Sequence, residues 1–173
     1  YRAQGQLELA VADFSSIIEV DPAYEPAYFN RGVLYVELEE NEKALNDFSK
    51  AIELTPEQTR SYYRRGLIYR EWGQNELYIA DLTRIIELEP TSESAYYNRG
   101  MAYHGMNRFE EAIADFTKAI EINPLSARAY NSRGYAYAQT HNRRLARDDF
   151  RKALELSTDP ALTRVIRGRL SRL

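Results

Sequence analysis

The chain has 173 residues, of which 44% are hydrophobic and 28% charged, and its formal net charge is −3. This composition predicts a buried core rather than disorder, and the weak negative charge argues against a generally basic nucleic-acid or membrane-surface protein. The absence of cysteine excludes a disulfide scaffold, zinc sites with thiolate ligands and a cysteine nucleophile. No apolar stretch approaches the roughly 18 residues of a membrane span, so we predict a soluble protein.

Several residue types recur along the chain with one shared period of about 34 residues. Arg-Gly pairs occur five times, from Arg31-Gly32 to Arg167-Gly168, and prolines follow the same spacing from Pro22 to Pro124. Tyrosines recur in the same way from Tyr28. A period shared by independent residue types without insertions indicates a tandem repeat, in which each repeat packs mainly on its neighbours.

Each repeat is predicted to form two helices. In residues 25–58, Tyr28 and Gly32 belong to one set of apolar positions with helical spacing, and Ala44 and Phe48 belong to a second set. A polar stretch separates the two sets, and a proline follows the second one, where a helix cannot continue. Small residues facing large ones are expected where the two helices approach closely.

In chain order, we predict one domain over residues 1–173 that contains a partial repeat, four whole repeats and a final helix. The ranges are 1–24 for the partial repeat, 25–58, 59–92, 93–126 and 127–160 for the whole repeats, and 160–173 for a C-terminal capping helix. By this register Tyr1 corresponds to Tyr35, so we expect the chain to open inside the first helix of a repeat.

At these residues the sequence resembles the tetratricopeptide repeat family, whose unit of about 34 residues has Trp or Tyr, Leu-Gly, Tyr, Ala, Phe and Pro in this order. The match is cleanest in residues 93–126, at Tyr96, Gly100, Tyr103, Ala112, Phe116, Ala119 and Pro124. The resemblance implies an all-α fold, a right-handed α-solenoid of tandem helix-turn-helix repeats. Arginine replaces the usual leucine before each glycine, and Tyr78 replaces a small alanine, from which we expect looser or shifted helix packing there.

An arginine and an aspartate recur at core-facing helical positions. They are Asp13, Arg31, Asp47, Arg65, Asp81, Arg99, Asp115, Arg133, Asp149 and Arg167. One such charge buried alone costs about 3 to 5 kcal/mol, so we predict a ladder of structural salt bridges. Pairing within a repeat would join Arg31 to Asp47, and pairing between repeats would join Asp47 to Arg65. We favour pairing between repeats, because Asp149 is the only ladder aspartate near Arg167 in the sequence, and bridging of both kinds stays open.

The residue types that catalysis would need are not gathered into a recognisable site. His104 and His141 lie in different repeats, without a repeating carboxylate at metal-ligand spacing, and are expected to be solvated. Five of the eight glycines belong to the Arg-Gly pairs, so no glycine-rich phosphate loop remains. We therefore predict no enzyme activity, no metal site, no cofactor and no small-molecule substrate.

In the family fold the first helices of the repeats line a concave groove, and the resemblance places partner-binding residues there. They are Phe29, Val33, Arg60, Tyr63, Leu67, Arg70, Tyr97, Met101, His104, Arg128, Asn131 and Tyr135. Their aromatic and apolar content favours a protein or peptide partner, and the arginines suit an acidic one. The alternative is that the aromatic residues pack between adjacent first helices and face no partner.

Three other functions remain open at this point. Residues 1–58 carry a net charge of −8 and residues 143–173 carry +5, so copies of the chain could associate head to tail as a homo-oligomer. The resemblance also includes members that clamp a chaperone C-terminal carboxylate, for which the candidates are Asn30, Arg60 and Arg64, or in a second frame Asn98, Arg128 and Ser132. Nucleic-acid binding through the basic end is weakly supported, because that end lacks interleaved aromatic residues.

Overall fold

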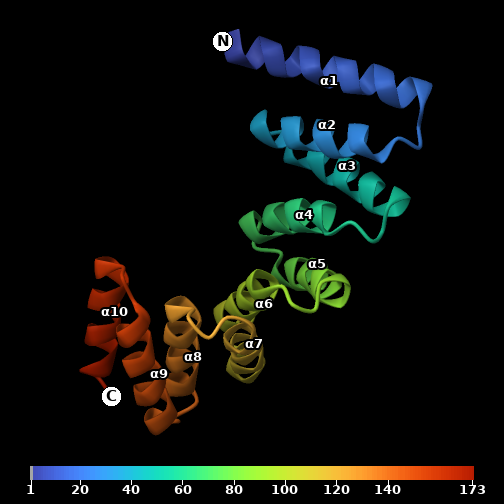
Figure 1. Cartoon of the computed structure of the whole chain (residues 1–173). Coiled ribbons are helices and arrows are strands. Elements are labelled where there is room, and N and C mark those ends of the chain that lie inside the picture. Colours follow the sequence, from blue (N-terminus) through green and yellow to red (C-terminus); the bar gives the residue numbers. More distant parts are fainter. Residues whose placement is uncertain (1) are drawn as a thin grey trace. The chain divides into compact units, whose positions relative to one another are not determined.

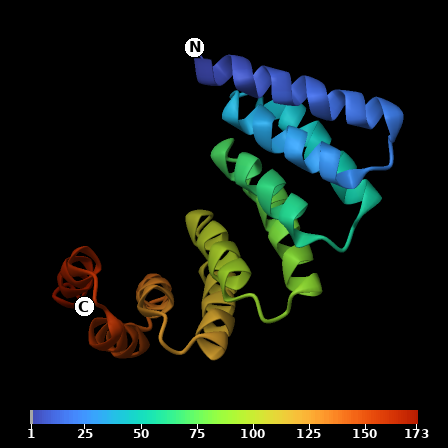
Figure 2. The ribbon, with the colours of Figure 1, turned by 45° about the horizontal axis from the view of Figure 1, so that its top comes forward.

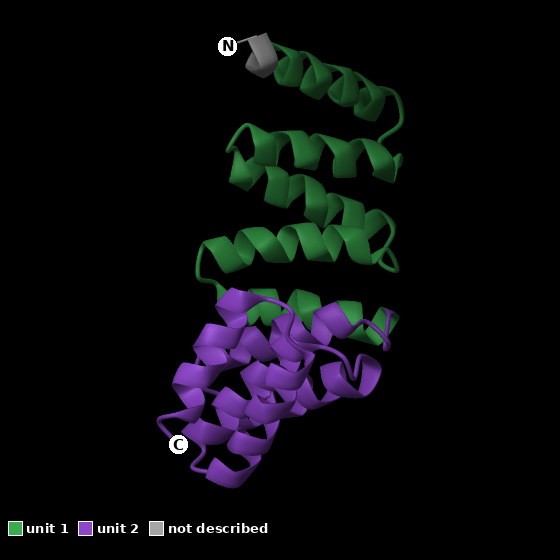
Figure 3. Cartoon of the chain, turned by 60° about the vertical axis from the view of Figure 1, so that its left-hand side comes forward, with its two compact units in different colours: residues 1–88 green, residues 89–173 purple. Residues whose placement is uncertain are grey.

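A computed structural model of the chain describes residues 2–173, with side chains from Gly5 onward, and Tyr1 lies outside the described residues. The chain divides into two compact units, residues 1–88 and 89–173 (Figure 3). Unit 1 contains α1 (Arg2–Val20), α2 (Glu25–Glu37), α3 (Asn41–Leu54), α4 (Thr59–Glu71) and α5 (Asn75–Leu88) (Figure 1). Unit 2 contains α6 (Glu93–Gly105), α7 (Phe109–Ile122), α8 (Ala127–Gln139), α9 (Arg143–Leu156) and α10 (Pro160–Leu170). The helices of the described chain confirm the predicted all-α fold class.

Successive helices form antiparallel pairs, α2 with α3 and α4 with α5 in unit 1, and α6 with α7 and α8 with α9 in unit 2 (Figure 2). The turn inside each pair contains one residue with a left-handed backbone. These residues are Glu39 (φ 62°), Gly73 (φ 70°), Asn107 (φ 59°) and His141 (φ 61°), which occupy the same position in successive repeats. A left-handed residue ends the first helix and lets the chain reverse direction.

Helix α1 differs from the expected partial repeat. By the repeat register, Gly5 corresponds to the left-handed residue Glu39, yet α1 is continuous from Arg2 to Val20. Leu7 and Glu8 favour a helix, and no described atom outside the local helix lies within 4 Å of a side chain at Gly5 to force a turn. The register therefore located the second helix of this repeat but not its beginning.

The helices of each pair approach so closely that the first one carries glycine at the contact. A Cβ atom added to Gly32 would lie 2.9 Å from the ring of Phe48, and one added to Gly100 would lie 2.8 Å from the ring of Phe116. The corresponding distance from Gly134 to Phe150 is 3.0 Å. Since real Cβ contacts are longer, only glycine allows this packing, and the rings are fully buried.

The pair α4 and α5 reaches the same close packing with two residues exchanged. Tyr78 is buried and brings its ring within 3.0 Å of a Cβ at Gly66, while Leu82 occupies the register position of Phe48. Of the looser or shifted packing expected around Tyr78, the structure shows the shift, because a large ring one turn earlier is matched by a smaller residue one turn later. The exchange buries the Tyr78 hydroxyl, and this burial raises its pKa although the nearby Arg70 opposes the rise.

The last helix, α10, packs on the end of unit 2. Asp159 caps its first turn by accepting a hydrogen bond from the Ala161 amide at 2.8 Å. Ile166 is fully buried in a cluster with Phe150 and Ala153 of α9. One face of α10 is therefore anchored in the core of unit 2, while Arg167 and Gly168 on another face are exposed.

We expect Gly100→Ala to lower the free energy of unfolding by about 2 kcal/mol, because the added methyl group overlaps the Phe116 ring. Gly105→Ala is the matched control at the end of the same helix, where no described atom outside the local helix lies within 4 Å of an added Cβ, and it should be neutral or stabilising by up to about 1 kcal/mol. Urea unfolding followed by circular dichroism measures both. Equal midpoints for the two variants would contradict the packing constraint.

Candidate partner-binding faces of the first helices

Each core arginine is held by the aspartate of its own helical pair. The Arg31 Nε and Nη2 atoms donate to Asp47 Oδ2 and Oδ1 at 2.8 and 2.7 Å. The same two-point contact joins Arg65 to Asp81, Arg99 to Asp115 and Arg133 to Asp149. The predicted pairing between repeats, Asp47 with Arg65, is therefore wrong. The aspartates are buried, and their hydrogen bonds raise the pKa of Arg31, Arg99 and Arg133.

The third donor of the arginine links neighbouring helical pairs through a hydroxyl group. Arg31 Nη1 donates to Ser15 of α1 at 3.0 Å, and Arg65 Nη1 donates to Ser49 of α3 at 3.1 Å. In unit 2, Arg133 Nη1 donates to Thr117 at 3.1 Å. Sequence reasoning missed these hydroxyls, although they recur once per repeat at Ser15, Ser49, Thr83 and Thr117. Contact between pairs thus runs through a neutral hydrogen bond and not through a second carboxylate.

The first and last members of the ladder differ from the others. Asp13 and Arg167 are both exposed, and neither forms an ion pair with another described residue. The expected partner of Asp13 in a ladder between repeats, Arg31, pairs with Asp47. The expected partner of Arg167, Asp149, pairs with Arg133. Both ends of the ladder are therefore open in this structure.

In unit 1, Arg60 and Phe29 of the predicted binding set contact each other and face Glu25. The Arg60 guanidinium lies 4.4 Å from the Phe29 ring centroid, and its Nη2 atom lies 2.5 Å from Glu25 Oε2. Glu25 is buried, and the Phe29 ring packs at 5.8 Å from the Phe48 ring. Phe29 and Arg60 thus contact each other between α2 and α4, and the Arg60 charge is paired with Glu25.

The other predicted residues of unit 1 are partly available. Val33 packs against the buried cluster of Phe48 and Ile68, and Leu67 is half-buried. The Arg70 side chain is exposed, with its guanidinium 5.8 Å from the Tyr78 ring centroid. Tyr63 is 43% exposed and is the most accessible aromatic residue of the predicted set.

In unit 2, the N-terminal half of α6, the turn between α7 and α8, and the first turn of α8 line an open polar pocket of about 330 Å³. Its lining consists of Glu93, Ser94, Tyr97, Asn98, Asn123, Ser126 and Arg128. The Tyr97 ring packs at 5.7 Å from the Phe116 ring, and Ser126 donates to Glu93 at 3.0 Å. Arg128 is exposed and forms no ion pair with any described residue, and the lining also carries Glu93, so the pocket has one charge of each sign. Two predicted residues, Tyr97 and Arg128, thus come together with five that the prediction did not include in its binding set.

Helix α10 contacts two further residues of the predicted set, and a third packs beside them. Arg169 Nη1 donates to Asn131 Oδ1 at 2.8 Å, and its guanidinium lies 4.6 Å from the Tyr135 ring centroid. The His104 ring lies between the rings of Tyr135, at 4.9 Å, and Phe109, at 5.6 Å. Asn131, Tyr135 and His104 are therefore engaged inside unit 2. Arg169 and Asn131 are 38 residues apart in the sequence, and no hydrogen bond at the equivalent positions joins the other described repeats. The period of the sequence therefore could not predict this contact.

His104 is half-buried, so its expected solvation is wrong, whereas His141 is exposed in a turn. Burial, and secondarily the charge of Arg169, lower the pKa of His104 from its ordinary value near 6.5. Within the described chain, no group of three or more histidine, aspartate or glutamate side chains could hold a metal ion. The described helices also include none that is long and apolar enough to span a bilayer.

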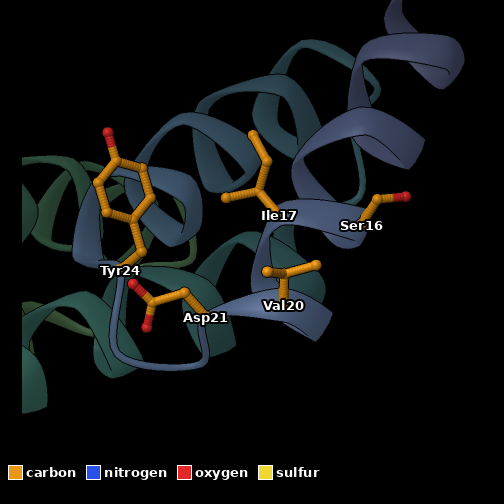
Figure 4. Close-up of a pocket in the computed structure, with 5 residues that line it drawn as sticks. All are labelled: Ser16, Ile17, Val20, Asp21 and Tyr24. Carbon is orange, nitrogen blue, oxygen red and sulfur yellow. The ribbon is translucent and has the colours of Figure 1, made fainter.

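An apolar hollow of about 480 Å³ lies in unit 1 at the C-terminal end of α1 (Figure 4). Ser16, Ile17, Val20, Asp21 and Tyr24 line it. Ile17, Val20 and Tyr24 are large and exposed, which solvent contact alone does not favour. Alignment of the repeats could have pointed to this hollow. Ile17 occupies the position of Ala51, Ala119 and Ala153, which are all fully buried, so its position is one that a neighbouring helix covers in those repeats.

Comparison with known families gives matches over most of the chain. Models described as tetratricopeptide repeat match residues 59–92, 94–124 and 127–160, and a model described as TPR repeat matches residues 32–73. Among curated protein sequences, none matches the chain.

Solved structures with a similar fold include MamA and YrrB. One MamA structure has a TM-score of 0.78 at 28% identity, with 90% of this chain and 85% of that chain covered. A second has a TM-score of 0.78 at 26% identity, with coverage of 99% and 95%. YrrB, described as a TPR protein with an unusual peptide-binding site, has a TM-score of 0.80 at 27% identity, with coverage of 96% and 86%.

We expect Asp47→Ala to lower the free energy of unfolding by about 3 kcal/mol, because Arg31 would keep its position without a carboxylate. Asp13→Ala is the matched control at the same register position. Since Asp13 is exposed and has no ion pair among the described residues, its loss should change stability by less than about 0.5 kcal/mol. Urea denaturation measures both, and equal losses would refute the assigned pairing.

We expect the pKa of His104 measured by NMR to lie below 6.5, because burial disfavours the imidazolium ion. Since protonation is then easier in the unfolded chain, the His104 contribution to stability falls as pH decreases from 6.5 toward the lowered pKa. Arg169→Gln removes a nearby positive charge and should shift the His104 pKa upward. An unchanged His104 pKa in this variant would contradict the effect assigned to the Arg169 charge.

Proposed function

Because the chain belongs to the tetratricopeptide repeat family and is a protein-interaction scaffold, we propose that it binds an extended peptide segment of a partner protein on the first helices of unit 2. The observation that carries this proposal is the open polar pocket lined by the N-terminal half of α6, the turn between α7 and α8, and the first turn of α8. Its volume of about 330 Å³ suits a few peptide groups and side chains, not a whole helix.

The pocket residues have the chemistry that peptide recognition requires. Asn98 offers both a donor and an acceptor, which match the alternating groups of an extended backbone. Tyr97 provides a ring held by its contact with Phe116, so its orientation is largely preformed. A preformed polar wall costs less ordering on binding than a mobile one.

The charges of the pocket favour a ligand with an acidic group at one position. Arg128 stands on one wall without an ion pair among the described residues, and Glu93 on the other wall is bonded to Ser126. Of the arginines expected to attract an acidic ligand, Arg60 is neutralised by Glu25. Arg128 is therefore the best candidate to bind an acidic side chain or a C-terminal carboxylate, the second frame of the clamp hypothesis.

Helix α6 extends the binding face beyond the pocket. Ser94, Tyr97, Asn98 and Met101 follow helical spacing on one side of the helix. Met101 is 41% exposed, and its flexible thioether can adapt to different apolar side chains. We infer that a peptide anchored at Arg128 runs along this face, with its next apolar residue against Met101.

The test is a peptide array that pairs acidic with neutral sequences and free with amidated C-termini. Wild type is compared with Arg128→Gln, and Arg147→Gln on the exposed side of α9 serves as the control of equal charge change. We expect Arg128→Gln to weaken binding of the best acidic peptides at least tenfold, about 1.4 kcal/mol, and Arg147→Gln to leave it unchanged.

Circular dichroism should show both variants folded, because neither arginine is buried. Tyr97→Ala is unsuitable as the main test, since the ring also supports the core at Phe116. Retention of the same peptides by Arg128→Gln with unchanged affinity would reject this pocket as the anchor. An array without any bound peptide would reject peptide recognition by the chain.

A further inference from the structure

The pocket of unit 2 has a counterpart in unit 1, two repeats earlier in the sequence. Three polar residues recur at equivalent positions, namely Glu93, Asn98 and Arg128 in unit 2 and Glu25, Asn30 and Arg60 in unit 1. Each set also contains an aromatic residue, Tyr97 in unit 2 and Phe29 in unit 1. The repeat between the two sets has none of the three polar residues at these positions, so the fold alone does not demand them.

The two sets are carried by equivalent helices. Glu25 is the first residue of α2, and Glu93 is the first residue of α6. Arg60 and Arg128 are the second residues of α4 and α8. The aromatic ring of each set packs on the phenylalanine of its own helical pair, at 5.8 Å between ring centroids in unit 1 and 5.7 Å in unit 2. The two sets therefore stand at the same places in their units, and they differ in how their side chains pair.

In unit 1 the arginine closes over the other two side chains. The Arg60 Nη2 atom donates to Glu25 Oε2 at 2.5 Å, and the guanidinium lies 4.4 Å from the centroid of the Phe29 ring. The Glu25 side chain is only 3% exposed. Closing thus buries the carboxylate, covers the ring and occupies the positive charge.

In unit 2 the equivalent side chains are apart. Arg128 forms no ion pair with any described residue, and Glu93 is only half-buried. Glu93 instead accepts a hydrogen bond from the Ser126 hydroxyl at 3.0 Å. Gln58 occupies the position of Ser126 in unit 1, and there Glu25 Oε1 is buried without a hydrogen-bond partner among the described residues. The serine hydroxyl is thus the polar contact that distinguishes the open set from the closed one.

We propose that the closed arrangement of unit 1 is a second state of the unit 2 pocket, and that the hydrogen bond from Ser126 to Glu93 keeps Arg128 open for the acidic group of a ligand. This proposal rests on the proposed peptide binding and adds its control. In the closed state Arg128 bonds Glu93 and lies over the Tyr97 ring, so the acidic group of a peptide has to displace the Glu93 carboxylate. Glu93 is therefore an internal competitor of the ligand, and Ser126 is a positioning residue.

The two states lie close in free energy, because each is held by contacts of similar strength. The ion pair of the closed state is partly exposed, since the Arg60 side chain is 44% exposed in unit 1, and such pairs contribute little. One hydrogen bond contributes a comparable amount, so the Ser126 hydroxyl is enough to favour the open state. The closed state is within reach, because 35 residues separate Arg128 from Glu93, as in the closed pair of unit 1.

The Ser126 hydroxyl donates to Glu93 and makes no other hydrogen bond among the described residues. Ser126 precedes α8 as its N-cap residue, yet its side chain forms no capping hydrogen bond. Ser126→Ala should therefore leave the helix content and the melting temperature of the chain unchanged. This variant removes the bond to Glu93 and little else, which makes it the main test.

The first experiment measures the two states without any ligand. Phenylglyoxal modifies free guanidinium groups faster than paired ones, and peptide mass spectrometry resolves the rate at each arginine. In the wild type we expect Arg128 to react about threefold faster than Arg60, whose ion pair makes it the internal reference for the closed state. Ser126→Ala should slow Arg128 to a rate close to that of Arg60, and adding Glu93→Gln should restore the wild-type rate. The control is Ser16→Ala, because this exposed serine bonds only its own helix, and it should change neither rate.

The second experiment uses the acidic peptide that binds best in the array. Ser126→Ala should weaken its binding roughly fivefold, because only the open fraction of the pocket binds. In the Glu93→Gln background, where Arg128 has no internal competitor, Ser126→Ala should change the affinity by less than about twofold. An equal loss in both backgrounds would overturn the proposal, because the hydroxyl would then act on the peptide itself.

The ligand-free rates keep this proposal separate from the proposed function. Equal reactivity of Arg128 and Arg60 in the wild type would overturn it, as would unchanged reactivity of Arg128 in Ser126→Ala. An array without any bound peptide rejects the proposed function, and the reactivity of Arg128 then still decides whether the closed state forms.

Discussion

The structure depends on a buried arginine that is bonded at two points by an aspartate of the same helical pair. This contact satisfies both charges inside the pair, where either alone would be costly. Its geometry also leaves one guanidinium nitrogen for the neighbouring pair, where Ser15, Ser49 or Thr117 accepts a neutral hydrogen bond. The arginine thus holds two helices together strongly and aligns the next pair without requiring a second buried charge.

Close packing imposes the second constraint, and the exchange at Tyr78 shows what it requires. The space beside Gly66 needs one ring and one smaller aliphatic group, and it accepts them in either order along α5. The total side-chain volume beside the glycine and the contact with it are therefore kept, although the residues that provide them differ from those of the other pairs. The exchange also buries the Tyr78 hydroxyl, a desolvation cost that the phenylalanine of the other pairs avoids.

The shared period of the sequence was enough to predict the all-α fold class, because glycine, tyrosine and proline have the same roles in every pair. The period could not decide which aspartate pairs with which arginine. Asp47 and Asp81 occupy equivalent positions in the repeats before and after Arg65, so the spacing alone allows either to pair with it. The candidate site was harder still to predict. Arg60, Asn131 and His104 are engaged by Glu25, Arg169 and Tyr135, contacts that do not recur along the described chain.

A repeat chain separates the residues that build it from those that can distinguish partners. The position of Arg128 is occupied by Pro26, Arg60 and Ser94 in the other pairs, and the position of Asn98 by Asn30, Arg64 and Ser132. These positions vary because the helical pairs fold with any of these residues there, so their chemistry is free to serve recognition. At the glycine, arginine and aspartate positions the same residue recurs, because each depends on a neighbouring helix for its burial.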